Sequence, residues 1–350
     1  MTNKKENIQW LDTLRTLATL GVVLIHVSSP IVNTTFHQNL NYWWIGNFLM
    51  SLTRYAVPMF LLLSGATMLL QEYKLSEFYR KRLMRVVVPF LFWIIVYFFF
   101  RYFTLPTKTP PMGFNNILSW ARKLFITEGV SKHFWYIYMI IFIYLLLPIL
   151  SKVAKKVSNK NMPYLLISWI IIASWCTRYA ANMYLFTDLG RIFKYVLFTG
   201  YLFLGSYIYT QVKVSNSIRI ISFIIFICTV AISAFSVYFT SIAANRTNQN
   251  IYNYMSLNTI IQSIALFILI KNWEIKNKIV EFINKEISNY SYGIYLVHIL
   301  ILGIMYNHKI FWSMAHPIIS IPIVFTLALV TSYFTIYLLR KIPYGKYISG

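Results

Sequence analysis

The chain of 350 residues is a succession of apolar stretches long enough to cross a bilayer, separated by short connections. A membrane-crossing helix needs about 20 mostly apolar residues in a row. Because lipid cannot satisfy exposed backbone groups, such stretches form helices, and the sequence predicts an all-α polytopic membrane protein that forms a single domain over residues 1–350. We expect about ten spans, near 14–32, 44–70, 86–104, 133–151, 163–181, 193–211, 218–240, 257–271, 290–307 and 318–339.

The charges follow the same division. The chain has 32 Lys and Arg against 9 Asp and Glu, and most of the basic residues lie between alternate apolar stretches. The tendency of Lys and Arg to remain on the cytoplasmic side explains this pattern better than nucleic-acid binding does. We therefore expect a cell-membrane protein with no nucleic-acid partner, with both termini and the segments 71–85 and 152–161 in the cytoplasm. The segments 105–132 and 308–317 are expected to face outward, and an amphipathic stretch at 117–124 is expected to lie in the membrane interface.

Two ionisable residues stand in the first span, Arg15 and His26. Such residues are costly inside a bilayer and are candidates for function. At 100° per residue, their separation of eleven positions brings both side chains to one face of the helix, about 16 Å apart along its axis. Asp12, one turn before Arg15, is expected to pair with it. Arg15 is then either a contact for the substrate, and so a candidate for binding and catalysis, or part of a structural ion pair.

Further candidates lie on other spans. Arg82 and Arg85 are one helical turn apart, and a guanidinium pair suits phosphate groups, although an ordinary positive-inside loop also explains their charge. His26 is the leading catalytic candidate, either as a base for a hydroxyl group or as the carrier of an acyl group, with a structural histidine as the plain alternative. His298 is expected to approach His26, either to act in the reaction or to hold His26 by a hydrogen bond.

The second and fourth spans add possible substrate contacts. Arg54 precedes Pro58, which is expected to break the helix and free backbone groups to line a cavity. His133 and Trp135 stand at the outer end of their span, where they either line a glycan entrance or serve as interfacial anchors. No two histidines have the spacing of a helical metal site and acidic residues are few, so we expect no metal.

Five strings in order resemble the acyltransferase-3 family of integral membrane O-acyltransferases along nearly the whole chain. They are LDTLRTLATLGVVLIH, RYAVPMFLLLSG, RKRLMR, HFWYIYMIIFIYLLLPIL and SNYSYGIYLVH. The resemblance implies that acyl-coenzyme A, most simply acetyl-CoA, binds from the cytoplasm at Arg82 and Arg85. It also implies functional roles for His26 and His298. On this interpretation, the substrate contact of Arg15 is with the phosphate or pantetheine part of the coenzyme A donor.

Within the second string, the resemblance gives Pro58, Ser64 and Gly65 supporting roles around the site. The expected function is transfer of an acyl group, most simply acetyl, to a hydroxyl of a cell-surface or lipid-linked glycan. The alternatives are a polysaccharide exporter, since prolines inside spans are typical of the broken helices of transporters, and a sensor or scaffold without chemistry. The absence of a repeated half argues against the exporter, and the sequence assigns no oligomeric state.

Overall fold

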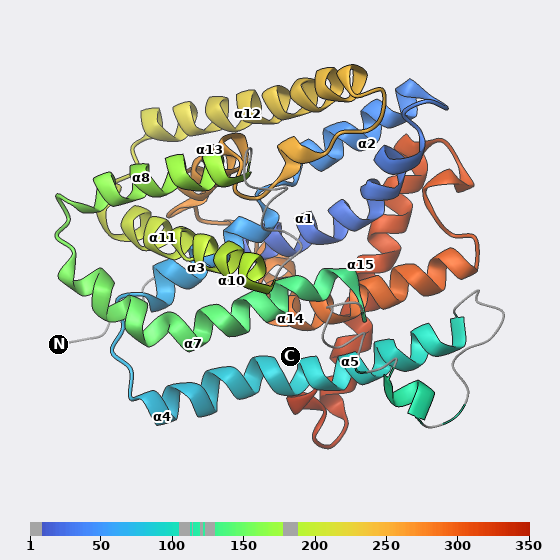
Figure 1. Cartoon of the computed structure of the whole chain (residues 1–350), viewed down its shortest axis with the longest axis horizontal. Coiled ribbons are helices and arrows are strands. Elements are labelled where there is room, and N and C mark those ends of the chain that lie inside the picture. The colour runs from blue at the N-terminus through green and yellow to red at the C-terminus, as the bar shows by residue number, and fades with distance from the viewer. Residues whose placement is uncertain (1–8, 105–112, 114, 120–121, 123–129, 178–187) are drawn as a thin grey trace.

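The computed structural model describes residues 9–104, 113, 115–119, 122, 130–177 and 188–350. Within these residues every regular element is helical (Figure 1). The α-helices are α1 (Gln9–Thr34), α2 (Leu40–Leu52), α3 (Ala56–Met68), α4 (Leu75–Phe78), α5 (Met84–Thr104), α7 (Trp135–Lys156), α8 (Met162–Trp175), α10 (Asp188–Phe198), α11 (Gly200–Gln211), α12 (Asn216–Ala243), α13 (Leu257–Ile270), α14 (Lys278–Asn307) and α15 (Pro317–Lys341). The π-helix η1 (Tyr79–Leu83) leads into α5, and short 3₁₀ turns are η2 (Lys132–Phe134), η4 (Asn250–Tyr252), η5 (Trp312–Met314) and η6 (Gly345–Tyr347).

The prediction of a polytopic all-α membrane protein is confirmed. In the described part of the chain, 9 helical stretches are long and apolar enough to cross a membrane, and each coincides with a predicted span. The predicted span near 163–181 corresponds to α8, which has 14 residues and ends at Trp175, and the rest of that span lies mostly outside the described residues. The predicted interfacial helix at 117–124 also includes residues outside the described ranges.

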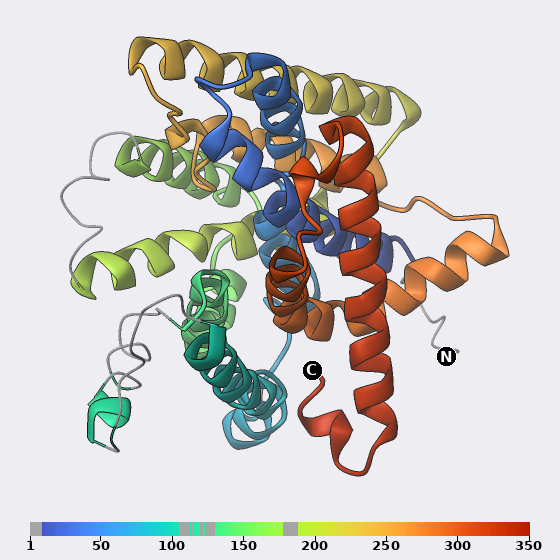
Figure 2. The ribbon, with the colours of Figure 1, turned by 90° about the vertical axis from the view of Figure 1, so that its right-hand side faces the viewer.

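Helix α1 runs through the interior of the bundle and contacts α2, α3 and α14. Figures 1 and 2 show α12 at one edge of the molecule and α4 with α5 toward the opposite edge, with α1 and α3 between them. Helix α15 packs against α14 and stands upright in both views. The first helix is therefore surrounded by others, which places its polar residues inside the protein.

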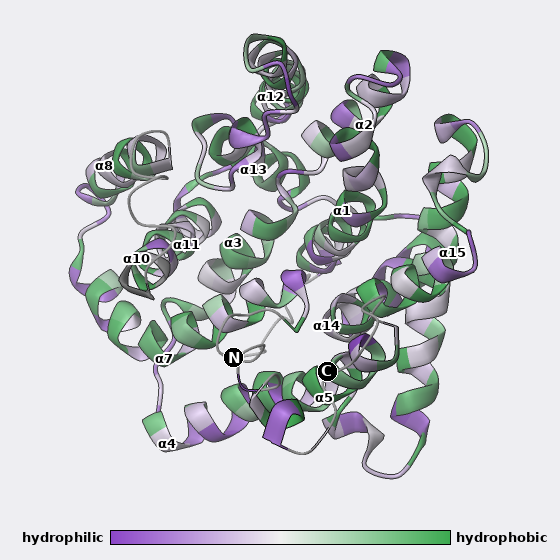
Figure 3. Ribbon diagram, turned by 45° about the vertical axis from the view of Figure 1, so that its right-hand side comes forward, coloured by the Kyte–Doolittle hydropathy of each residue, from purple (hydrophilic) through white to green (hydrophobic). Residues whose placement is uncertain are grey.

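Hydrophobic residues cover most of the length of the long helices, and hydrophilic residues gather at their ends and connections (Figure 3). Helix α12 illustrates which side chains face outward. Its large apolar residues Ile220 and Phe239 are 61% and 63% exposed, whereas its small polar residues Ser233 and Ser241 are fully buried. This distribution is the reverse of that of a water-soluble helix, and it suits a surface in contact with lipid.

The predicted second span is divided into α2 and α3 at Thr53–Tyr55. Pro58 was expected to break the helix, and it lies in the first turn of α3, three residues beyond the break. A proline cannot donate to the carbonyl four residues earlier and its ring clashes with that carbonyl, which here belongs to Arg54. The helix therefore ends before Arg54, and α3 restarts with hydrogen bonds from Ala56 N to Thr53 O and from Met59 N to Tyr55 O.

Helices α3 and α11 approach each other through two glycines. A Cβ atom on Gly65 would lie 2.0 Å from the carbonyl oxygen of Leu202, and one on Gly205 would lie 2.0 Å from that of Leu62. Any other residue at either position would push the two backbones apart. This contact is the small-residue packing typical of membrane helices.

Candidate active site

Helix α1 is fastened to α14 by polar contacts along its first half. Thr16 Oγ1 donates to the carbonyl oxygen of Asn284 at 2.8 Å. Arg15 Nη1 donates to Asp12 Oδ1 and to Ser288 Oγ, each at 2.9 Å, and Ser288 Oγ donates to Asp12 Oδ1 at 2.7 Å. The predicted Asp12–Arg15 pair is thus present, and the hydroxyl of Ser288 links it to the facing helix.

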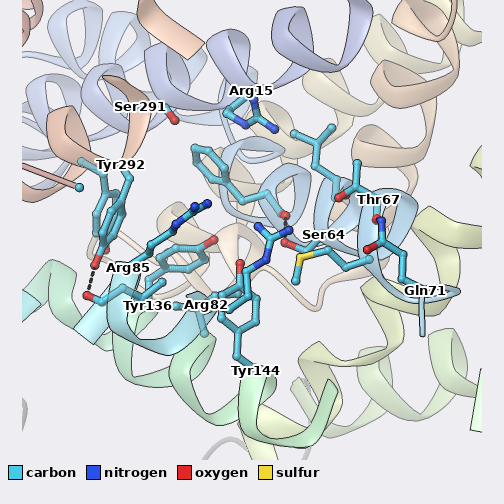
Figure 4. A pocket seen from close by; sticks show the side chains of 17 residues that line it. Arg15, Ser64, Thr67, Gln71, Arg82, Arg85, Tyr136, Tyr144, Ser291 and Tyr292 are labelled. Carbon is cyan, nitrogen blue, oxygen red and sulfur yellow. Dashed lines mark hydrogen bonds between the residues drawn. The ribbon is translucent and has the colours of Figure 1, made fainter. Parts of the chain in front are cut away.

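Beside this network lies a cavity of about 480 Å³, the arginine cavity, to which α1, α3, α5, α7 and α14 all contribute. Arg15, Arg82 and Arg85 line it together, as Figure 4 shows. The other lining residues are Phe60, Leu63, Ser64, Thr67, Met68, Gln71, Val86, Tyr136, Ile140, Tyr144, Ser291, Tyr292, Tyr295 and Gly350. None of the described lining side chains is acidic, and Arg82 and Arg85 give the cavity a positive wall, while the charge of Arg15 is paired with Asp12.

The π-helix η1 and the first turn of α5 supply Arg82 and Arg85. Short π-helical segments inside α-helices are frequent at functional sites. Both arginines are exposed at the cavity mouth, and in the described part of the chain neither has an ion-pair partner. Burial raises the pKa of nearby Tyr73 to about 12, against the opposing effect of Arg82, so this phenol remains neutral beside the arginine. Arg82 and Arg85 are therefore available to an anionic ligand.

Three histidines from different elements meet inside the bundle, and we call them the histidine cluster. The ring centroid of His26 lies 5.2 Å from that of His298 and 6.4 Å from that of His133, and the last two are 5.4 Å apart. The expected approach of His298 to His26 is therefore observed. His133 stands in the first turn of the stretch Lys132–Lys156, at the end of its span as predicted, and its side chain is buried with 3% exposure.

Hydrogen bonds fix how the ring of His298 is oriented. Its Nδ1 lies 2.7 Å from the carbonyl oxygen of Tyr295 and 3.1 Å from that of Ile294, so Nδ1 carries a proton. Its Nε2 is buried and has no hydrogen-bond partner among the described residues, and the same holds for Nε2 of His133. His133 Nδ1 contacts Ser131 Oγ at 2.7 Å. His26 is partly exposed, unlike the other two.

Tyr295 joins the two parts of the site. It lines the arginine cavity, and its ring centroid is 5.7 Å from that of His298 and 5.4 Å from that of His133. Its hydroxyl donates to the carbonyl oxygen of His133. The inner part of the arginine cavity therefore adjoins the histidine cluster.

The string SNYSYGIYLVH contains further residues of the site besides the predicted His298. Ser288, Ser291, Tyr295 and His298 follow one another at intervals of three or four residues, so they share one face of α14. That face contacts α1 and the arginine cavity. Helical periodicity within the string could have identified the first three residues from sequence.

The remaining predicted residues occupy two places. Ser64 lines the arginine cavity and donates to Phe60 O at 2.9 Å. Arg54 and Trp135 line a second cavity of about 340 Å³, together with residues of the connection between α12 and α13. Among the described residues, no group of three or more His, Cys, Asp or Glu side chains is arranged to hold a metal ion.

The helices of membrane-crossing length and the charged cavity inside them define a multi-pass membrane protein with a buried polar site. A family sequence model described as an acyltransferase domain matches residues 8–339, nearly the whole chain, and the protein belongs to this acyltransferase-3 family. Membership supports a membrane acyltransferase. No curated protein and no solved structure matches the chain.

Proposed function

We propose that the protein transfers an acyl group, acetyl in the simplest case, from acyl-CoA to a hydroxyl of a cell-surface or lipid-linked glycan. The observation that carries this proposal is that a cavity lined by three arginines and no described acid adjoins a cluster of three histidines. An anionic donor and proton-transfer chemistry then have neighbouring places in one bundle. In this proposal the end of the bundle that carries Arg82 and Arg85, the arginine end, faces the cytoplasm.

The donor's phosphates account for the arginines. Coenzyme A carries a pyrophosphate and a 3′-phosphate, and planar guanidinium groups bind phosphate oxygens in pairs. Arg82 and Arg85 at the mouth would hold these groups, while Arg15, already bonded to Asp12 and Ser288, offers a preorganised contact on the opposite wall. The thioester arm would extend past Tyr295 toward His26, which is about 16 Å from Arg15 along α1.

The histidine cluster supplies the chemistry. The oxygen of the acceptor hydroxyl attacks the thioester carbonyl while the imidazole of His26 removes its proton. The carbon–sulfur bond then breaks, and coenzyme A leaves as a thiolate that receives this proton from the imidazolium of His26. In the two-step alternative, His26 first accepts the acyl group and then passes it to the hydroxyl.

His298 fits a positioning role beside His26. Because its Nδ1 proton is held by backbone carbonyls, its unpartnered Nε2 presents a lone pair that can accept a hydrogen bond from an N–H of a neighbouring imidazole. His133 lies at similar distances from both rings, so it would restrict their orientation.

Transfer of label from radioactive acetyl-CoA into envelope glycan tests the proposal. Membranes containing the protein should form an ester-linked product that alkaline hydroxylamine releases. His26→Ala should abolish the product, whereas His308→Ala, which changes an exposed histidine outside the site, should retain it. Full transfer by the His26→Ala protein would refute the mechanism, and the absence of transfer by the native protein would favour the exporter or scaffold.

A further inference from the structure

The second cavity, which we call the Arg54 cavity, lies toward the opposite end of the bundle from Arg82 and Arg85. Its lining residues are Arg54, Trp135, Lys194, Gln249, Asn250, Tyr252, Asn253 and Tyr254. The segment that contributes most of them is held against the end of α1 farther from Arg15, since Thr247 Oγ1 donates to Val32 O at 2.9 Å. Arg54 and Gln71 lie on either side of α3 and line different cavities. Their separation of 17 positions corresponds to about 25 Å along a helix axis, so the two cavities lie toward opposite ends of α3.

The arginine in this cavity is almost fully buried. Arg54 is 5% exposed, its Nε donates to Met50 O at 2.9 Å, and its Nη2 contacts Met50 Sδ at 3.4 Å. Its guanidinium carbon lies 4.8 Å from the ring centroid of Tyr252 and 5.6 Å from that of Tyr254. None of these partners in the described structure is an acid, so the charge of Arg54 is stabilised by rings and one carbonyl.

A buried cation without a carboxylate is costly unless a ligand supplies the opposite charge. The two tyrosines that contact Arg54 are held in place by hydrogen bonds of their own. The Tyr252 hydroxyl donates to Asn47, and the Tyr254 carbonyl accepts from Tyr201. The guanidinium is therefore held in place beside a cavity lined by a second cation, Lys194, and by no described acid.

The remaining lining is suited to a sugar. The rings of Trp135 and Tyr254 are stacked on each other with centroids 5.7 Å apart, and Lys194 Nζ lies 5.3 Å from the Trp135 centroid, so the two rings form an aromatic wall of the cavity. Gln249, Asn250 and Asn253 contribute amide groups. Gln249 Nε2 donates to Asn33 and Asn253 Oδ1 accepts from Met255 N, so the Gln249 carbonyl oxygen and the Asn253 amide nitrogen are the groups left for a ligand. Trp135 begins α7 directly after the turn η2 that carries His133, so the cavity and the histidine cluster draw residues from one segment.

We propose that the Arg54 cavity binds the acyl acceptor and that this acceptor is a saccharide with an anionic group paired to Arg54. This inference rests on the proposed acyl transfer and specifies its second substrate. The anion is either a carboxylate of an acidic sugar or a phosphate that links the sugar to another group. Donor and acceptor then enter from opposite ends of the bundle and meet at the histidine cluster.

Direct binding of small probes tests the proposal without requiring transfer. Glucuronate, glucose 1-phosphate and glucose are titrated against the full chain in nanodiscs by saturation-transfer NMR at constant ionic strength. We expect the better of the two anionic sugars to bind at least about tenfold more tightly than glucose, as one charged hydrogen bond provides. Preference for glucuronate indicates the carboxylate source, and preference for glucose 1-phosphate indicates the phosphate source.

Variants locate the binding. Arg54→Gln should remove the anion preference and retain acetyl-CoA binding, whereas Arg246→Gln, an exposed arginine in the same connection, should change neither. Equal affinity of the native protein for all three sugars overturns the inference, and this result requires no variant to fold. An anion preference that survives in Arg54→Gln but disappears when Arg82 and Arg85 are both replaced by glutamine also overturns the inference. Anion binding at Arg54 without any acetyl transfer would instead refute the proposed reaction while leaving the ligand class in place.

Discussion

Replacing Arg82 and Arg85 by glutamine should weaken acyl-CoA binding while leaving the bundle folded. Both side chains are exposed, and in the described structure neither takes part in an ion pair, so their removal leaves no buried partner behind. A hydrogen bond to a charged group contributes roughly 1.5–3 kcal/mol, and the lower figure applies at a mouth open to water. We therefore expect the Kd to rise about tenfold for each substitution and by more than about tenfold for both together.

Equilibrium binding of labelled acetyl-CoA to the protein in nanodiscs measures this effect. Arg80→Gln is the matched control, because Arg80 is exposed in the same π-helix but does not line the arginine cavity. Acetyl-dephospho-CoA, which lacks the 3′-phosphate, shows which arginine contacts that group: the variant without that arginine should bind both donors equally. Unchanged affinity in the double variant would show that the two arginines act only in membrane orientation.

The remaining predictions concern chemistry, topology and packing. His26→Ala should lower the transfer rate by at least about 10²-fold while acetyl-CoA stays bound, and His298→Ala should reduce it less; the reverse order would make His298 the base. Cysteines at Ser76 and Ser313 should show opposite labelling by an impermeant reagent in whole cells, with position 313 reactive and position 76 protected, and the inverse pattern would reverse the topology. Gly65→Ala should destabilise the protein by roughly 1–3 kcal/mol in a thermal assay, because its Cβ would overlap a backbone carbonyl, and unchanged stability would show that α3 can move away from α11.

Much of the fold could be predicted because a bilayer leaves few choices. Length and apolarity alone located nine spans, and the proline rule anticipated a break in the second. The location of the break, at Thr53–Tyr55, follows from which carbonyl the Pro58 ring would meet, a relation that the apolar pattern does not contain. The extension of α14 before its predicted span, from residue 278 to 289, was not predicted, because polar side chains such as Asn284, whose Nδ2 donates to Thr13 Oγ1, contact α1 rather than ending the helix.

The site was predictable where one helix carried the geometry. Arg15 and His26 share a face of α1, and the pairing of Arg15 with Asp12 followed from their spacing. The depth of His133 was not predictable, since it depends on how far the turn before α7 enters the bundle, and tertiary packing rather than local sequence sets that distance. Its meeting with His298 is for the same reason visible only in the folded protein.

The glycine contact between α3 and α11 has a mechanical consequence. With their backbones in direct contact at Gly65 and Gly205, the two helices can neither rotate nor slide past each other without separating. The wall of the arginine cavity that α3 provides is therefore stiff, whereas the facing wall begins at a π-helical segment with exposed arginines. The segment that carries Arg82 lies outside this glycine contact, so we expect it to move when the cavity widens to admit a bulky nucleotide, and the groups that capture the donor would move with it.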